Sequence, residues 1–209
     1  DEMGKISLNA SQVDEALLNQ ILINLGYDEA DASIVADSIV DWRDEDDLHR
    51  ANGAEDDYYR KLDRPYPCKD APFDSVEELR LVRGVTRAMF YGHDDIPGLR
   101  DIFTAAHDQK VLRSRTASDK VERALCGDPQ HRGRDKKGLD DRTDEERAFD
   151  VSTCLKETGL APSPRNQRRD EKLRYATIEA RVMDPAGGDR VIAHVGAQVQ
   201  FDRGDDFVT

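Results

Sequence analysis

A dense group of negative charges lies between Asp41 and Asp57. The segment reads DWRDEDDLHRANGAEDD and holds eight carboxylates, followed at once by Tyr58 and Tyr59. Because carboxylates at close quarters repel one another, a folded chain keeps them together only if water solvates them or a hard cation neutralises them. Calcium is therefore the first candidate ligand, and a solvated acidic surface is the alternative.

Two features of the segment favour a folded, cation-binding loop. Asn52-Gly53 is a turn signal that can fold the second acidic group back onto the first. Trp42, Tyr58 and Tyr59 supply the bulk that anchors a loop to a core. We expect an ordered loop here.

Other metal and redox patterns do not match the chain. Cys68, Cys126 and Cys154 lack any CxxC spacing, which argues against a zinc site or a thioredoxin-like motif. An EF-hand beginning at Asp44 would need glycine at the sixth position, where His49 stands. Any calcium site is therefore irregular.

Composition limits the kinds of partner. The chain has 209 residues, 36% of them charged, and a formal net charge of -13. This charge disfavours nonspecific binding to nucleic acid or to an anionic membrane surface, whereas a cation or a basic partner fits. No apolar run approaches the roughly 20 residues that cross a bilayer. Since neither an initiator Met nor a signal-peptide pattern stands at Asp1, we expect a mature or truncated piece of a longer protein.

The first half of the chain reads as helical. Ser11 is the expected N-cap of a helix that ends at Gly26, and a second helix is expected from Asp28 to Trp42. After the proline-rich connection RPYPCKDAPFD, Ser75 and Glu78 form a capping-box pattern. Gly84 then separates that helix from a short one at Thr86–Tyr91, which is a helix-hairpin-helix outline.

In the second half of the chain, the expected secondary structure changes from helix to strand at APSPRNQRRD. Before it we expect a helix at Asp119–Cys126, a loop at Gln130–Leu139 and a helix at Thr143–Thr158. After it, KLRYATIEARV and RVIAHVGAQVQF alternate apolar and polar residues around the turn DPAGGD, which predicts a hairpin, and Phe207-Val208 is expected to be in another strand. The fold class is therefore α+β.

Four stretches, taken in order, resemble the minor pseudopilin K family of bacterial type II secretion systems: DEMGKISLN, DWRDEDD, NGAEDDYY and DAPFDSVEELRLVRGV. The resemblance is dense from the first residue to about Val85. Beyond Val85 it is weaker, and Thr116-Ala117-Ser118 is the part that resembles the second helical unit of the family. From Leu173 onward only the strand pattern remains. The chain departs from the family at Arg43, where a nonpolar residue is usual, and in the charged stretch Gln130–Arg142.

The resemblance implies a small antiparallel pseudopilin sheet that carries a large helical insertion of two helix-hairpin-helix-like units. On that basis residues 1–10 form a strand leading out of the pseudopilin core, and residues 11–112 form the first helical unit with the acidic loop. Residues 113–165 form the second helical unit, and residues 166–209 return as strands of the core.

The function implied by the resemblance is non-enzymatic. The family caps the tip of the periplasmic pseudopilus together with the I and J types of minor pseudopilin, and supports export of folded proteins across the outer membrane. Secreted proteins are further expected partners. The resemblance places the chain in the periplasm, anchored in the inner membrane before assembly by an N-terminal helix that lies outside these residues.

The resemblance also implies bound calcium and a set of site residues. Carried over by position, the expected metal region comprises Asp41, Asp44, Asp46, Asn52, Glu55, Asp56 and Asp57, with the direct ligands left open. If the protein is periplasmic, Cys126 and Cys154 are expected to form a disulfide that leaves Cys68 free.

Two alternatives come from other functional classes. The helix-hairpin-helix outline around SVEELRLVRGV suggests a nucleic-acid-binding protein, although the acidic charge counts against it. Asp44 and Asp46 suggest a metal-dependent hydrolase or glycosyltransferase, but no base, nucleophile or phosphate-binding glycine loop accompanies them.

Overall fold

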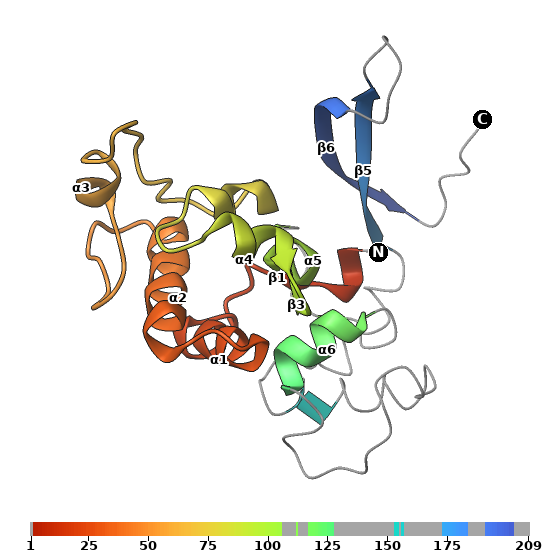
Figure 1. The fold of residues 1–209 in the computed structure, drawn as a ribbon, viewed down its shortest axis with the longest axis horizontal. Coiled ribbons are helices and arrows are strands. Elements are labelled where there is room, and N and C mark those ends of the chain that lie inside the picture. Colours follow the sequence, from red (N-terminus) through yellow and green to blue (C-terminus); the bar gives the residue numbers. More distant parts are fainter. Residues whose placement is uncertain are drawn as a thin grey trace.

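The computed structural model describes residues 2–105, 112, 117–127, 153, 154 and 156, together with the backbone of residues 173–183 and 191–202 (Figure 1). Its N-terminal elements are η1 (Glu2–Gly4), β1 (Ile6–Ser7), α1 (Glu15–Leu25), α2 (Glu29–Arg43), α3 (Asp56–Tyr59) and η2 (Val76–Arg80). They are followed by α4 (Arg87–Tyr91), β2 (Gly92–His93), β3 (Ile96–Pro97), α5 (Leu99–Ile102), β4 (Phe103–Thr104), α6 (Asp119–Cys126), β5 (Leu173–Met183) and β6 (Val191–Asp202). The predicted α+β class is confirmed.

Side-chain caps determine where the first two helices begin. The predicted start of α1 at Ser11 is wrong, because the Asp14 carboxylate accepts the amide of Leu17 at 2.9 Å and makes Asp14 the N-cap. The C-cap is Gly26 as predicted, with a left-handed φ of 101°. The second helix was expected from Asp28 to Trp42, and Asp28 is its N-cap, since the Asp28 carboxylate accepts the amide of Asp31 at 2.9 Å.

The helix–glycine–helix outline is present in a modified form. Ser75 and Glu78 make the predicted capping box, but the helix they begin, η2, is a 3₁₀-helix rather than an α-helix. The second helix is α4, whose N-cap is Thr86. A Cβ atom on Gly84, which has φ +83°, would lie 2.9 Å from the Ile34 side chain of α2. Glycine therefore allows this turn to pack closely against α2.

Long-range contacts join the helices into one body. β1 pairs in parallel with β4, with Ile6 opposite Phe103, so the strand expected to lead out of the pseudopilin sheet pairs within the helical body instead. The Asn9 amide nitrogen donates to the carbonyls of Phe73 and Ala105 at 2.9 and 3.1 Å. Three distant segments thereby meet at Asn9.

A single hydrophobic core fills the helical body. Its fully buried members include Leu18 and Ile21 of α1, Val35 and Ile39 of α2, and Val121 of α6. Because α6 lies beyond the expected boundary between residues 112 and 113, the core crosses that boundary.

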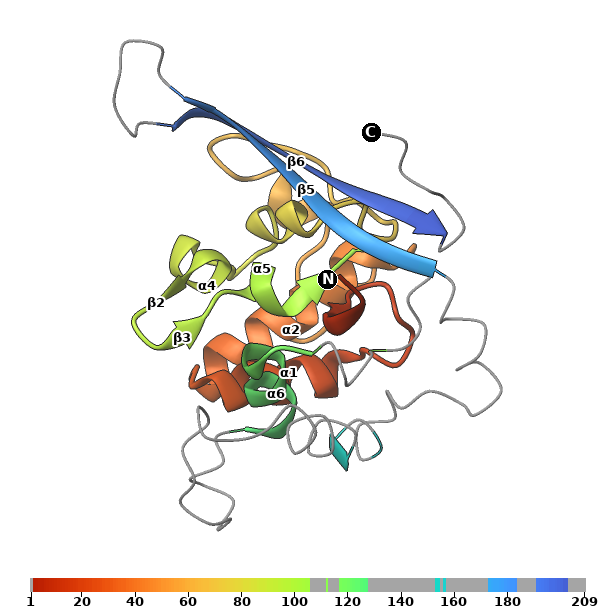
Figure 2. The same ribbon diagram turned by 90° about the vertical axis from the view of Figure 1, so that its right-hand side faces the viewer.

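The C-terminal strands form the predicted hairpin. β5 and β6 pair antiparallel from Leu173 opposite Asp202 to Met183 opposite Val191. Figures 1 and 2 show the hairpin as a layer along one side of the helical body, beside the N-terminus, where β5 contacts η1.

Several expectations fall on residues outside the described part of the chain. They concern the loop Gln130–Leu139, the DPAGGD turn, Phe207-Val208 and most of the helix Thr143–Thr158. Of that last helix, Thr153, Cys154 and Lys156 are described and are helical. Within the described residues, no helix has the length and apolar character needed to cross a bilayer.

Candidate metal centre

An arginine neutralises two carboxylates in the first half of the acidic segment. Asp41, in the last turn of α2, is fully buried, and its carboxylate accepts Nη1 of Arg50 at 2.7 Å and the Arg50 amide at 3.1 Å. The same Nη1 donates to Asp44 at 2.8 Å. Burial raises the pKa of Asp41, while the bonds to Arg50 act against that rise. A side-chain cation therefore balances Asp41 and one oxygen of Asp44.

The Asn52-Gly53 turn does bring the chain back onto α2. A Cβ atom on Gly53 would lie only 1.8 Å from Oδ2 of Asp41, so the backbone of residue 53 rests directly on that carboxylate. The Asn52 amide and side chain both donate to Asp37, at 2.9 and 3.1 Å. Asn52 is thus engaged in holding the turn.

Three of the expected metal residues lie at the surface with local partners. Asp56 pairs with Arg60 at 2.6 Å and Asp57 with Lys61 at 3.0 Å, each along one turn of chain. Asp46 is exposed and accepts a backbone amide two residues on. Asp46 and Asp57 are solvated, whereas the half-buried Asp56 also accepts the amide of Cys68 at 2.9 Å.

Glu55 differs from all of these. Only 2% of the residue is exposed, and neither carboxylate oxygen has a hydrogen-bond partner in the described part of the chain. Its pKa is raised to about 7: burial is the largest cause, the Cys68 thiol acts against the rise, and the negative charges of Asp41, Asp70 and Asp44 add to it. Glu55 is therefore a buried acid that lacks a cation.

The surroundings of Glu55 offer more oxygen atoms. Ligand atoms of Glu55, Cys68 and Asp70 lie within 4.8 Å of one another. One oxygen of Asp70 and one of Asp44 are also buried without a hydrogen-bond partner among the described residues. Burial raises the pKa of Cys68, so the thiol stays protonated and the charged donors are carboxylates. Oxygen donors of this kind fit a hard divalent cation such as calcium.

Sequence reasoning thus found Glu55 and Asp44 but missed Asp70 and Cys68. Both lie in the proline-rich connection, where Asp70 adopts a left-handed φ of 50°. The Cys68 amide donates to the Asp56 carboxylate at 2.9 Å and ties the connection back to α3. The sequence does show an aspartate, Asp70, soon after the acidic segment. Its approach to Glu55 could not be predicted, because it depends on how the proline-rich connection folds back onto α3.

Aromatic rings anchor the site to the core. The ring of Trp42 lies 5.2 Å from that of Tyr59, which in turn lies 5.4 Å from that of Tyr66. Tyr59 is fully buried, and its hydroxyl accepts the amide of Arg83 at 3.2 Å. The Trp42 indole nitrogen donates to Glu78 at 3.3 Å. The expected anchoring of the loop by aromatic bulk is present.

Arg43, the departure noted in the sequence, also has a structural use. Its guanidinium donates to the carbonyls of Leu8 and Val13 and so fastens the end of α2 to the segment before α1.

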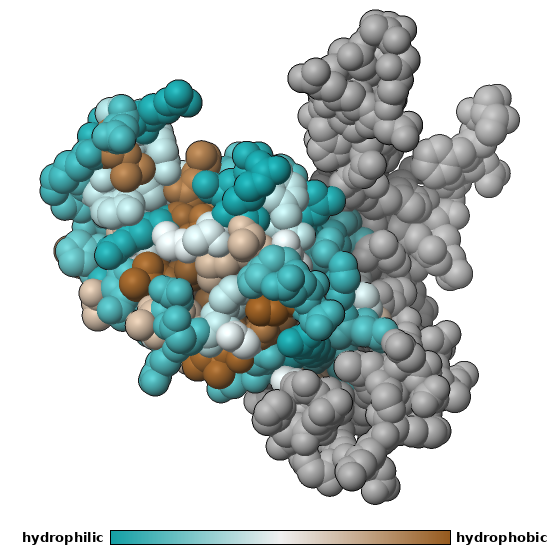
Figure 3. All heavy atoms as spheres, in the orientation of Figure 1, coloured by the Kyte–Doolittle hydropathy of each residue, from teal (hydrophilic) through white to brown (hydrophobic). Residues whose placement is uncertain are grey.

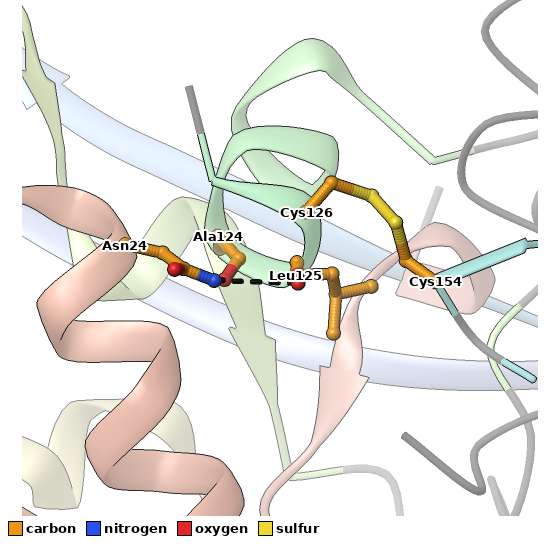
Figure 4. The surroundings of a disulfide bond; sticks show 5 residues. All are labelled: Asn24, Ala124, Leu125, Cys126 and Cys154. Carbon is orange, nitrogen blue, oxygen red and sulfur yellow. Dashed lines mark hydrogen bonds between the residues drawn. A yellow bond between two sulfur atoms is a disulfide. The ribbon is translucent and has the colours of Figure 1, made fainter. Parts of the chain in front are cut away.

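The cysteines are arranged as predicted for a periplasmic protein. Cys126 and Cys154 form a disulfide with their Cα atoms 5.7 Å apart, and Cys68 is free and buried (Figure 4). Figure 4 also shows Asn24 of α1 pointing at the last turn of α6, where it donates to the carbonyls of Ala124 and Leu125 at 2.9 and 3.3 Å.

Comparison with known proteins agrees with this arrangement. The family described as type II secretion system (T2SS), protein K, matches residues 4–91, which hold α1, α2, the acidic segment and the η2–α4 turn. Residues 4–91 belong to the protein K family. Type II secretion system protein K of Aeromonas hydrophila is 32% identical over 137 residues, which are 58% of this chain and 41% of that protein. Protein K of Pectobacterium carotovorum subsp. carotovorum is 36% identical over 70 residues, which are 34% of this chain and 21% of that protein.

The similarity to a solved protein K extends over both parts of the fold. A chain of the GspK-GspI-GspJ complex from enterotoxigenic Escherichia coli superimposes with a TM-score of 0.56 at 17% identity, over 94% of this chain and 77% of that chain. This similarity shows a shared fold. The chain matches between 21% and 41% of the length of the two bacterial relatives above. None of these matches points to a nucleic-acid-binding family.

Proposed function

We propose that this chain is a non-enzymatic structural component at the tip of a type II secretion pseudopilus, where it supports export of folded proteins across the outer membrane. The observation that carries the proposal is the shared fold with GspK, which spans 94% of the chain, together with the protein K match over residues 4–91. A nucleic-acid-binding role and a metal-dependent hydrolase both lack such support.

The proposed partners are minor pseudopilins of the I and J types. GspK is found with GspI and GspJ in the similar structure, which supports an equivalent three-protein assembly here. Secreted proteins are proposed as transient partners. The proposed location is the periplasm, and the proposed inner-membrane anchor is a helix that precedes residue 1.

Assembly tests this proposal. The chain alone should be a monomer by light scattering, and should form an equimolar complex, with a raised melting temperature, when I-type and J-type pseudopilins are both added. Each partner added alone serves as the control. Filaments of the isolated chain, or no complex with the two partners together, would count against the tip role.

We also propose that the Glu55 centre binds calcium. Support comes from the two unpartnered oxygens of buried Glu55 and from those of Asp44 and Asp70. When bound, the ion would supply the positive charge that this centre lacks, while Asp41 stays with Arg50. The role is structural, since the ion would hold the proline-rich connection against the end of α2.

Removal of metal tests the calcium proposal. A chelator should lower the melting temperature, and calcium should restore it better than magnesium, which prefers a tight octahedron with retained waters. Calcium at a hundredfold excess over Kd should add about 2.7 kcal/mol to the free energy of unfolding. Glu55→Gln should remove this response, whereas the matched change Asp57→Asn, at an exposed pair, should keep it. If chelator leaves the melting temperature unchanged, the calcium proposal is wrong and the segment is a solvated acidic surface.

A further inference from the structure

Three arginine side chains pack around the ring of an exposed tyrosine. The guanidinium carbons of Arg87, Arg100 and Arg80 lie 5.1, 5.4 and 5.9 Å from the centre of the Tyr91 ring. These residues come from α4, α5 and η2, and Tyr91 itself remains 40% exposed. We call these four residues the arginine–tyrosine surface.

The positive charge of this surface stands out on an acidic chain. The whole protein has a net charge of -13, yet in the described residues Arg87 forms no salt bridge. Arg80 has only Glu77, at 3.8 Å, beyond normal hydrogen-bond length. Both Arg80 and Arg87 are exposed, so their donors can meet a carboxylate from outside.

Apolar contact is available beside the charge. Few large hydrophobic side chains in the described part are exposed, and Leu81, at 43%, follows Arg80 directly. Figure 3 shows that hydrophobic areas on the visible face of the helical body are small and separated by hydrophilic residues. A partner that needs a broad apolar face is therefore a poor fit, whereas Tyr and Arg together are the residues most often central to protein interfaces.

A neighbouring cavity sets a limit on where such a partner can lie. Tyr91 also lines a cavity of about 550 Å³ beside the β2–β3 hairpin and α6, and its walls include Asp94, Asp95, Asp101 and Asp119. Those carboxylates repel an acidic ligand. Contact with a negative partner is therefore expected on the arginines and not inside the cavity.

We propose that the arginine–tyrosine surface binds a short acidic segment of another protein. A carboxylate of that segment pairs with Arg80 and Arg87, and an adjacent aliphatic side chain packs on Tyr91 and Leu81. A long polyanion such as nucleic acid meets the repulsion of the whole chain, whereas a short segment placed on Arg80 and Arg87 avoids most of that repulsion. The proposal does not rest on the pseudopilus role or on calcium.

The test uses the full chain and a synthetic peptide, Glu-Asp-Leu-Glu-Asp, with Gln-Asn-Leu-Gln-Asn as its uncharged counterpart. The acidic peptide should shift the NMR signals of the arginine Nε–H groups and of the Tyr91 ring, and the uncharged one should not. Arg80→Glu/Arg87→Glu should weaken peptide binding by about tenfold or more. The single change Arg87→Glu has Arg64→Glu as its matched control, an equal charge change at another exposed residue, and the control should leave the affinity within about twofold.

Four results would overturn the proposal. The first is equal binding of both peptides. The second is an equal loss of affinity in the Arg64 control, which would indicate a general charge effect. The third is tighter binding of a DNA oligonucleotide than of the peptide through the same arginines, which would favour a nucleic-acid site. Self-association through this surface, detected by light scattering and abolished by the double variant, would identify a second copy as the occupant and would also count against it.

Discussion

At the residue scale, the acidic segment depends on how each carboxylate is neutralised. Arg50 contacts Glu15, Asp41 and Asp44 at 2.7, 2.7 and 2.8 Å, whereas Glu55 has no such partner in the described chain. Two acids of similar burial therefore differ in what stabilises them. Asp41 is held by a residue of the same chain, and Glu55 is left for an ion or a proton.

Loss of Arg50 should be costly. Arg50→Gln leaves the fully buried Asp41 carboxylate without a cation, and breaking a buried pair in this way typically costs about 3 kcal/mol or more. Urea unfolding should show this loss. Arg60→Gln, which removes the exposed partner of Asp56, is the control and should change stability little. The prediction is wrong if the two variants are equally stable.

Glu55 should make calcium-free stability depend on pH. Between its ordinary pKa of 4.5 and its folded value of about 7, the folded chain keeps a proton that the unfolded chain has released. The folded state then binds more protons, so the free energy of unfolding falls as pH rises through this window. Urea unfolding at pH 5, 6, 7 and 8 in chelator should show the fall. Glu55→Gln should flatten it, and an identical pH profile in both proteins would contradict the assignment.

At the element scale, short helices are held by contacts at their ends. The last turn of α6 leaves carbonyls without helical partners, and Asn24 of α1 supplies donors to two of them, at Ala124 and Leu125. The disulfide from Cys126 holds the same end of α6 to Cys154. An eight-residue helix, marginal by itself, is thereby fixed on α1.

Asn24→Ala should weaken this attachment. Removing the donor leaves the α6 carbonyls poorly satisfied, at a cost of about 1 to 2 kcal/mol. Asn19→Ala, the same change in the same helix, is the matched control, because among the described residues the Asn19 side chain makes one 3.4 Å bond, to Ser33. Thermal melting should rank Asn24→Ala well below Asn19→Ala, and the reverse order would refute the role given to Asn24.

At the scale of the whole molecule, distant segments share one core. α1 and α6 lie about a hundred residues apart in sequence, as the Asn24 bonds show, yet both contribute fully buried side chains to the same cluster. The β1–β4 pair and Asn9 add further long-range links. The helical body should therefore behave as one cooperative unit and not as two units divided after residue 112.

Hydrogen exchange tests this cooperativity. In low urea, the slowest amides of α1, such as Ile21, and those of α6, such as Leu125, should open with the same free energy and the same urea dependence. Reduction of the disulfide serves as a comparison, because it should lower both values together. Opening of α6 at a clearly lower free energy than α1 would indicate separate units.

Local sequence signals determined much of the fold. The caps at Asp28 and Gly26, the Ser75–Glu78 box and the helix Asp119–Cys126 depend on neighbours within a few residues, so they were predictable from the sequence. The C-terminal hairpin was predictable for the same reason, since alternation and a turn lie side by side in the chain. Ser11 failed as a cap because Asp14 is a competing local signal, three residues on.

Only the tertiary structure decided which charges meet. Arg50 reaches Glu15 across 35 positions of sequence, and Asp70 approaches Glu55 because the proline-rich connection folds back over α3. No periodicity or spacing encodes such contacts, since they arise when segments far apart pack on a common core. For this reason the sequence determined only that many carboxylates stand close together in this segment, and the packing decided that Arg50 satisfies Asp41 while Glu55 has no hydrogen-bond partner among the described residues.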